Sequence, residues 1–182
     1  RGNTHEPMTG GGCDACHGEA GGEKPFATTL SGAEACAQCH DVDDLKKGGT
    51  VEHVPFAKGD CLSCHDPHTG FGQHLLTAAG NGSCTQCHAE AGLMKRNPHA
   101  AVTEGDGCLS CHEAHATKEK HLLIAPEDKL CLECHDGDGG AKHTHAPFAE
   151  GMCTSCHDAH GSDQPSMFKG PTGTVCYECH VD

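Results

Sequence analysis

The chain has 182 residues, of which 16 are cysteine, 18 are histidine and 25 are glycine, while 3% are aromatic and tryptophan is absent. This composition cannot supply the aliphatic and aromatic core of an ordinary globular domain of similar length. With histidine neutral the formal charge is −14, so nucleic acid and anionic membrane surfaces are poor partners. No stretch approaches the ~20 apolar residues of a membrane-spanning helix, so no transmembrane segment is predicted.

The five-residue motif Cys-x-x-Cys-His occurs eight times and uses every cysteine of the chain. Two thiols at this spacing can add to the two vinyl groups of one haem, and the imidazole that follows can bind the iron from the same side. The sequence therefore predicts eight haem c groups. The cysteines predicted to attach them are Cys13, Cys16, Cys36, Cys39, Cys61, Cys64, Cys84, Cys87, Cys108, Cys111, Cys131, Cys134, Cys153, Cys156, Cys176 and Cys179. The histidines predicted to bind the irons from this proximal side are His17, His40, His65, His88, His112, His135, His157 and His180.

Disulfides and zinc sites are the alternatives to haem. A short chain with 16 cysteines can form a disulfide framework, and the four cysteines of the first two motifs have the C-x2-C-x19-C-x2-C spacing of a zinc ribbon. Neither alternative accounts for the histidine after every second cysteine. Disulfides need no histidine, and a four-thiolate zinc site has no place for one. Haem attachment is therefore favoured.

In chain order the motifs form four pairs. The first cysteines of the two motifs in a pair are always 23 residues apart, whereas 25, 24 and 22 residues separate successive pairs. The repeat predicts four two-haem modules, at about residues 1–47, 48–94, 95–140 and 141–182, within a single octahaem unit over residues 1–182. With about 23 residues per haem, we predict a haem-dominated fold, mostly coil with short α-helices and little or no β-structure, in which the modules wrap around a continuous haem chain.

Two short helices are predicted from local signals. Ser31 and Glu34, three residues apart, are typical of a capping box, which predicts a helical turn that carries the second motif of module one. Pro126 is followed by two acidic residues, which predicts a helix that begins there and runs into Cys131.

Ten histidines lie outside the motifs and are candidates for the distal face of each iron. Four of them, the upstream histidines, precede the first cysteine of their module by eight or nine residues: His5, His53, His99 and His145. Three more, the post-motif histidines, follow the first motif of modules two, three and four in the pattern CxxCHxxH: His68, His115 and His160. Module one breaks this pattern, because Ala20 stands at the equivalent position.

The paired motifs together with CxxCHxxH resemble the doubled-CxxCH family of multihaem cytochromes. That family includes periplasmic electron carriers and the decahaem components of outer-membrane conduits in metal-reducing bacteria. The resemblance covers nearly the whole chain and implies an electron-transfer protein. It is specific for the two-haem module and does not single out one member of the family.

The distal ligands can be narrowed further by geometry. A histidine three residues after the proximal one lies on the same side of a helical turn, so we predict that each post-motif histidine binds the iron of a neighbouring haem. With the four upstream histidines this gives seven distal ligands. We favour His143 as the eighth, because an extended backbone points the side chains of His143 and His145 in opposite directions.

Other residues compete for that eighth position. His74 and His121 are rivals of His143, and are otherwise predicted to lie at the surface or to bind haem propionates. A methionine ligand is a further alternative, since an axial methionine would raise the potential of one haem above its neighbours. The methionines are Met8, Met94, Met152 and Met167.

Bis-histidine ligation leaves no iron open to a substrate, so the sequence predicts an electron-transfer protein rather than an enzyme. The alternative is a multihaem reductase acting on nitrite, hydroxylamine or a sulfur oxyanion, and the post-motif position of module one is the only hint of an open iron. About 23 residues per haem leave little protein to shape a substrate pocket.

Localisation and partners follow from the haem chemistry and from the resemblance. Thioether attachment takes place outside the cytoplasm, so we expect a secreted protein whose signal peptide has been removed, with a charge of about −22 once the haem propionates are counted. Filament-forming surface cytochromes have similarly little protein per haem and short-spaced histidine pairs resembling His143 and His145. The resemblance therefore implies a homopolymeric extracellular filament that serves redox partner proteins or extracellular acceptors, such as a mineral or another cell. A soluble periplasmic or porin-inserted octahaem carrier is the alternative.

Overall fold

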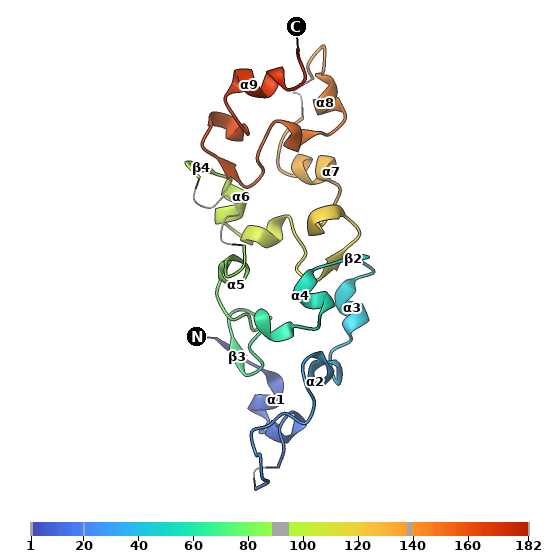
Figure 1. The fold of residues 1–182 in the computed structure, drawn as a ribbon, viewed down its shortest axis with the longest axis vertical. Helices are drawn as coiled ribbons and strands as arrows, with labels where there is room; N and C mark the ends of the chain where they lie inside the picture. The colour runs from blue at the N-terminus through green and yellow to red at the C-terminus, as the bar shows by residue number, and fades with distance from the viewer. Residues whose placement is uncertain (1, 20, 89–94, 138–139, 182) are drawn as a thin grey trace. The chain divides into compact units, whose positions relative to one another are not determined.

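The computed structural model of the chain describes residues 2–19, 21–88, 95–137 and 140–181. Short helices and turns joined by coil make up these residues, as Figure 1 shows. The predicted fold, mostly coil with short helices and little β-structure, is confirmed. The α-helices of the described residues are α1 (Glu6–Thr9), α2 (Ala33–Ala37), α3 (Val42–Lys46), α4 (Val54–Ala57), α5 (Gly82–Thr85), α6 (Ala100–Thr103), α7 (Glu127–Leu132), α8 (Ala146–Ala149) and α9 (Thr172–Tyr177). None of the described helices is long and apolar enough to cross a membrane.

The helices follow the repeat. The upstream histidine of each module is the N-cap residue of a one-turn helix, so that α1, α4, α6 and α8 are equivalent elements. A proline at the first or second position of α1, α4 and α8 has no N–H to leave unbonded and favours the start of a helix there. The second motif of each module lies at the end of α2, α5, α7 or α9, and the first motif begins in a 3-10 turn.

The β-structure of the described residues consists of three antiparallel pairs of two-residue strands. In each pair, the strand just before an upstream histidine pairs with the strand just after the post-motif histidine of the next module. The pairs are β1 (Asn3–Thr4) with β3 (Thr69–Gly70), β2 (Val51–Glu52) with β5 (Ala116–Thr117), and β4 (Asn97–Pro98) with β6 (Gly161–Ser162). Modules two, three and four therefore each contribute a short segment to the module before them.

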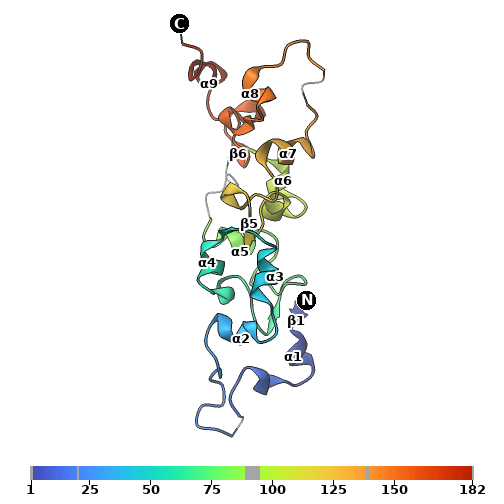
Figure 2. The same cartoon turned by 90° about the vertical axis from the view of Figure 1, so that its right-hand side faces the viewer.

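The chain divides into two compact units. Unit 1 comprises Arg1–Gln86 together with Ala114–Lys118, and unit 2 comprises Cys87–Glu113 together with Glu119–Asp182. The segment of module three that pairs with β2 therefore belongs to unit 1, although the rest of that module belongs to unit 2. Figure 2 gives a second view of the elements within each unit.

The polypeptide buries very little apolar surface by itself. Among the described residues, the buried hydrophobic side chains are those of Val102, Ala116 and Val175. Larger apolar side chains are exposed, including Leu132 at 52% and Tyr177 at 66%. A chain of this size with so small a core needs another apolar component for stability.

Local signals predicted both helices, and they predicted correctly how one of the two begins. Helix α7 begins directly after Pro126, as expected. Helix α2 also forms, but the predicted capping box is wrong. Its N-cap is Gly32, with a φ of 53°, and no side chain caps the helix. Gly32 can adopt this left-handed conformation without steric cost, and it displaces Ser31 from the capping position.

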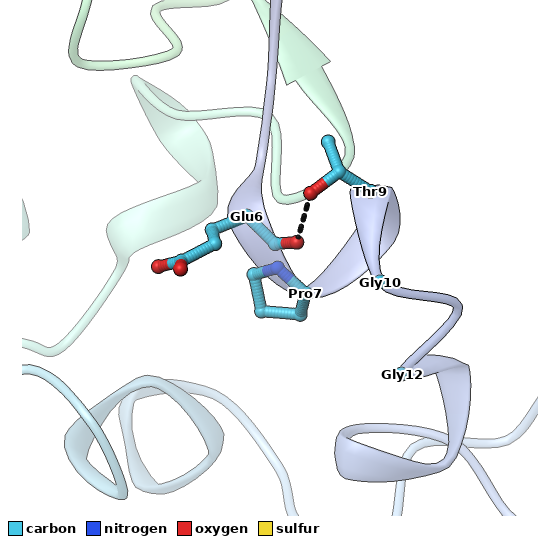
Figure 3. Close-up of a pocket in the computed structure, with 5 residues that line it drawn as sticks. All are labelled: Glu6, Pro7, Thr9, Gly10 and Gly12. Atoms are coloured by element: carbon cyan, nitrogen blue, oxygen red, sulfur yellow. Dashed lines mark hydrogen bonds between the residues drawn. The ribbon is translucent and has the colours of Figure 1, made fainter.

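Helix α1 shows how these one-turn elements are closed. The Thr9 hydroxyl donates a hydrogen bond of 2.7 Å to the Glu6 carbonyl, as the dashed line in Figure 3 marks. The hollow drawn there is lined by Glu6, Pro7, Thr9, Gly10 and Gly12. It contains neither a motif residue nor a histidine, so it is not a candidate for haem binding.

Candidate haem-binding sites

Seven CxxCH motifs of the described residues are each folded as a single turn that gathers the three reactive side chains. In module one, the His17 main-chain N–H donates to the Cys13 carbonyl at 2.9 Å, and the His40 N–H donates to the Cys36 carbonyl at 2.9 Å. The same bond recurs at 3.0 or 3.1 Å in the motifs that end at His65, His112, His135, His157 and His180. Residues three and four apart lie on one face of such a turn, so the two sulfurs and the imidazole can reach one macrocycle.

The proximal histidines of the first motifs are oriented by a second hydrogen bond. The Nδ1 atom of His17 donates to the Phe26 carbonyl at 3.0 Å, and that of His65 donates to the His74 carbonyl at 2.6 Å. His112 and His157 make the same bond, at 2.9 Å, to residues 121 and 166. A neutral imidazole that donates from Nδ1 has its Nε2 lone pair available for a metal, which is the usual arrangement for a ligating histidine.

Burial favours the same neutral form at His112. Desolvation lowers the pKa of His112, and the neighbouring histidines, first among them His160, lower it further against the opposing hydrogen bond to the His121 carbonyl. The ring is therefore held in the form that binds iron.

Histidine rings of the described residues face each other in pairs at nearly constant separation. The distances between ring centroids are 6.0 Å for His5 and His40, 6.0 Å for His17 and His68, 6.1 Å for His65 and His115, 5.8 Å for His99 and His135, 6.0 Å for His112 and His160, and 5.9 Å for His145 and His180. The planes of five pairs lie within 23° of parallel, and those of the pair formed by His65 and His115 are tilted by 37°.

This separation fits one iron atom between two imidazoles. Two metal–nitrogen bonds of about 2.0 Å, with roughly 1.1 Å from each nitrogen to its ring centre, place the centroids about 6 Å apart. The thiols of the motif and the exposed apolar side chains would hold the macrocycle around that iron. The residues present therefore fit haem c.

The six pairs obey two rules. The upstream histidine faces the histidine of the second motif in its own module, as His5 faces His40. The post-motif histidine faces the histidine of the first motif in the preceding module, as His68 faces His17. The post-motif histidine therefore lies opposite the histidine of a neighbouring motif, in the direction that turn geometry predicts. Module one lacks a post-motif histidine of its own, and His17 is nevertheless paired, because its partner His68 comes from module two.

His74 and His121 contribute their main chains to the site. Their carbonyls accept the Nδ1–H bonds of His65 and His112, while their side chains are exposed. In module four Ser166 supplies the same carbonyl, which explains why a serine can stand there. Neither His74 nor His121 faces a motif histidine within the described residues. Sequence reasoning missed this role, because a carbonyl contact depends on backbone shape rather than on residue type.

The eighth distal ligand is not identified by a ring pair. His143 is exposed, and in the described part of the chain it has no hydrogen-bond or ring partner. The His157 ring stacks on Phe168, at a centroid distance of 4.8 Å, rather than facing a histidine. Among the methionines, Met94 lies outside the described residues and Met167 accepts a main-chain hydrogen bond from Asp158 at 2.8 Å. The distal roles predicted for His53 and His143 stay predictions.

Cysteines of successive motifs approach each other within both units. The thiol of Cys36, in the second motif of module one, has the thiol of Cys61, in the first motif of module two, as a close neighbour. Burial and then this neighbour raise the pKa of Cys36. In unit 2, burial followed by the thiol of Cys153 raises the pKa of Cys131 to about 11. The sulfurs that attach consecutive haems would thus lie side by side.

The two alternatives to haem find no support in the structure. None of the 16 cysteines forms a disulfide. Within residues 2–19, 21–88, 95–137 and 140–181, no group of three or more His, Cys, Asp or Glu side chains is arranged to hold a metal ion. A zinc ribbon needs four protein ligands, whereas a haem iron takes four nitrogens from the porphyrin and needs only two from the protein.

Paired CxxCH turns with oriented imidazoles on a chain that has almost no core define a multihaem c-type cytochrome, a class of protein that binds haem c and transfers electrons. The doubled CXXCH motif is matched four times, at residues 5–45, 53–93, 99–140 and 145–182, and the chain belongs to this family. All four matches begin at an upstream histidine. For His5, His99 and His145, that residue faces the second-motif histidine of its own module. No curated protein shows significant sequence similarity to the chain.

Proposed function

We propose that the chain holds eight haem c groups and conducts single electrons along them. The observation that carries this proposal is the set of six facing imidazole pairs at 5.8–6.1 Å. Haem iron changes between the ferrous and ferric states, so each group can hold one electron. An iron between two protein imidazoles has no open position for a substrate, which favours conduction over catalysis. The adjacent sulfurs of Cys36 and Cys61 support close spacing of consecutive haems.

Haem content and spin state test this proposal together. A pyridine haemochrome assay should give eight haems per chain, and electron paramagnetic resonance of the oxidised protein should show low-spin iron at no fewer than seven of them. Carbon monoxide should bind to one haem at most in the reduced protein. Carbon monoxide binding to several haems, or steady turnover of nitrite or hydroxylamine, would contradict a conducting role and favour a reductase.

We further propose that the protein works outside the cytoplasm as a subunit of an extracellular filament. It would pass electrons to redox partner proteins or to an extracellular acceptor such as a mineral or another cell. The resemblance to filament-forming surface cytochromes supports this assembly, because this chain also has only about 23 residues per haem. A contact between unlike surfaces that can be repeated without closing produces a filament. The alternative is a soluble periplasmic or porin-inserted octahaem carrier.

Electron microscopy separates these two assemblies. Negative staining of the holoprotein over a wide concentration range should show filaments whose length grows with concentration. Discrete particles at every concentration would rule out a filament of this chain alone and leave the carrier. The spectroscopic test above does not depend on this outcome, so conduction and assembly can fail separately.

A further inference from the structure

The joint between consecutive modules is built from five contacts that act together. Where module three meets module two in unit 1, the His115 ring faces His65 across 6.1 Å. The His53 N–H donates to the His115 carbonyl at 2.8 Å, and His53 Nδ1 donates to the Ala114 carbonyl at 3.1 Å. Phe56, three residues after His53, packs against the His115 ring at a centroid distance of 4.9 Å. The strands β2 and β5 pair directly beside these contacts.

The same joint recurs at the other two module boundaries. His5 donates from its main-chain N–H to the His68 carbonyl and from Nδ1 to the Pro67 carbonyl, both at 2.9 Å. His99 donates to the carbonyls of His160 and Ala159 at 3.0 and 2.8 Å. One half of the joint is therefore a docking face, made by the upstream histidine, the first-motif histidine and an apolar residue. The other half is the post-motif segment that docks on it.

Module four carries a complete docking face, and no segment of the described residues is docked on it. His145 occupies the position of His53, Phe148 that of Phe56, and His157 that of His65. Among the described residues, neither the N–H nor the Nδ1 of His145 has a hydrogen-bond partner, and no histidine ring faces His157. None of the residues outside the described ranges is a histidine. Phe148 is 43% exposed.

A second copy of this chain does not offer the matching segment at its first module. The equivalent position there is Ala20, which has no imidazole to present. The post-motif segments of modules two, three and four are already docked within the chain, through His68, His115 and His160. The ligand therefore has to come from a module with the CxxCHxxH pattern that this chain does not contain.

We propose that module four is a docking site for the post-motif segment of a further doubled-CxxCH module, whose histidine completes the iron held by His157. This inference rests on the proposed function, because it requires haem at that motif. The segment recognised is a Cys-His-x-x-His turn with the short strand that follows it, bound through the main-chain N–H and Nδ1 of His145 and packed against Phe148. A filament of identical copies would need a joint of another kind.

In this arrangement His143 lies on the edge along which the incoming segment would pair, and not at the position of an iron ligand. It is equivalent to Asn3, Val51 and Asn97, each the first residue of a strand that pairs with the incoming segment. At 143–144 the described chain has bend and coil instead of strand. A segment that docks on module four would pair along this edge, beside His145.

A short peptide tests the site directly. We would titrate the holoprotein with a peptide of residues 65–71 carrying His65→Ala, which retains the post-motif histidine His68. The control peptide also carries His68→Ala. The reduced protein alone should bind carbon monoxide at one haem. The first peptide should abolish that binding and convert one haem to the low-spin form, with an affinity about tenfold or more above that of free imidazole because main-chain hydrogen bonds add to ligation. The control peptide should do neither.

Variants of the chain identify the site. Phe148→Ala should weaken peptide binding about threefold or more without changing carbon monoxide stoichiometry, whereas Val54→Ala, on an exposed side chain of the equivalent helix α4, should leave both unchanged. His160→Ala should raise the stoichiometry by one haem, and the peptide should not reverse this increase, because the post-motif segment of module four still covers that site.

Three results would overturn the proposal. The first is a wild-type protein that binds no carbon monoxide while His143→Ala binds one equivalent, which would make His143 the ligand. The second is a carbon monoxide site that ignores the peptide. The third is a site that closes as the protein associates with itself at high concentration, which would make the donor a second copy. Carbon monoxide binding at several haems would instead contradict the proposed conducting function.

Discussion

At the scale of single residues, histidines of the same type have different roles, and a matched pair of variants separates them. His68 presents its ring to His17, whereas His74 uses its carbonyl to orient His65 and exposes its ring. His68→Ala should therefore create a high-spin signal from one haem and add one equivalent of carbon monoxide binding. His74→Ala should leave the spectrum and the carbon monoxide stoichiometry unchanged. A high-spin signal in His74→Ala would show that its side chain binds iron.

Asp66 shapes the turn that carries His68, and its protonation provides a second test. Its carboxylate accepts main-chain hydrogen bonds from His68 at 2.8 Å and from Thr69 at 3.2 Å. The His68 bond first, and the Thr69 bond second, lower the pKa of Asp66 below its usual value of 3.8. A group whose pKa is lower in the folded state stabilises the fold above its unfolded pKa, and this contribution is lost as the pH falls through the folded pKa.

The turn should thus persist at neutral pH and loosen in acid, below the usual titration range of an aspartate. Amide chemical shifts of His68 and Thr69 in the reduced protein, made diamagnetic by saturation with carbon monoxide, should follow this transition. Asp66→Asn keeps the acceptor oxygen but cannot be protonated, so the acid transition of these two amides should disappear while the turn remains. An unchanged transition in Asp66→Asn would assign it to another group.

At the scale of the elements, each post-motif segment is held in place where its main chain lies close to another stretch of main chain. A Cβ atom built on Gly70, in β3, would overlap the main chain of Leu75. Gly70→Ala should therefore displace β3 from β1, at a cost of about 1–3 kcal/mol, and move His68 away from His17. The expected result is a high-spin signal from one haem.

Gly173 provides the control for this substitution. It lies in α9, and a Cβ atom there would meet nothing within 4 Å. Gly173→Ala should leave the spin state unchanged and favour the helix by about 1 kcal/mol, because alanine has the higher helix propensity. Equal spectral effects of the two variants would mean that β3 does not position His68.

The elements also show where sequence reasoning ends. The thioether sites and the helix after Pro126 were predictable, because covalent spacing and proline geometry are local properties. The pairing of His17 with His68 was not, because it depends on two-residue strands whose paired residues are 65 and 67 positions apart and carry no hydrophobic pattern. The turns that hold the His121 and Ser166 carbonyls could also not be predicted from the sequence. They adopt φ values of 58° and 53°, in a region where glycine is the usual residue.

At the scale of the whole molecule, the missing core and the ring pairs have one explanation. Within the described residues the buried hydrophobic side chains are Val102, Ala116 and Val175, far too few to offset the conformational entropy lost when a chain of 182 residues folds. The paired imidazoles stand at a distance set by an iron atom rather than by contact between the rings. Haem would therefore supply both the apolar interior and the links between modules, and the geometry described here is that of the haem-bound protein.

The haem-free chain should accordingly be disordered. Far-ultraviolet circular dichroism of the reduced, haem-free polypeptide should show neither the helical signal of the holoprotein nor a cooperative thermal transition. Reduction alone is the control, because the holoprotein treated with the same reductant should keep its spectrum. Cooperative, native-like unfolding of the haem-free chain would mean that the polypeptide carries a core of its own. The facing histidine pairs would then be held by protein packing, and their 6 Å spacing would need another cause.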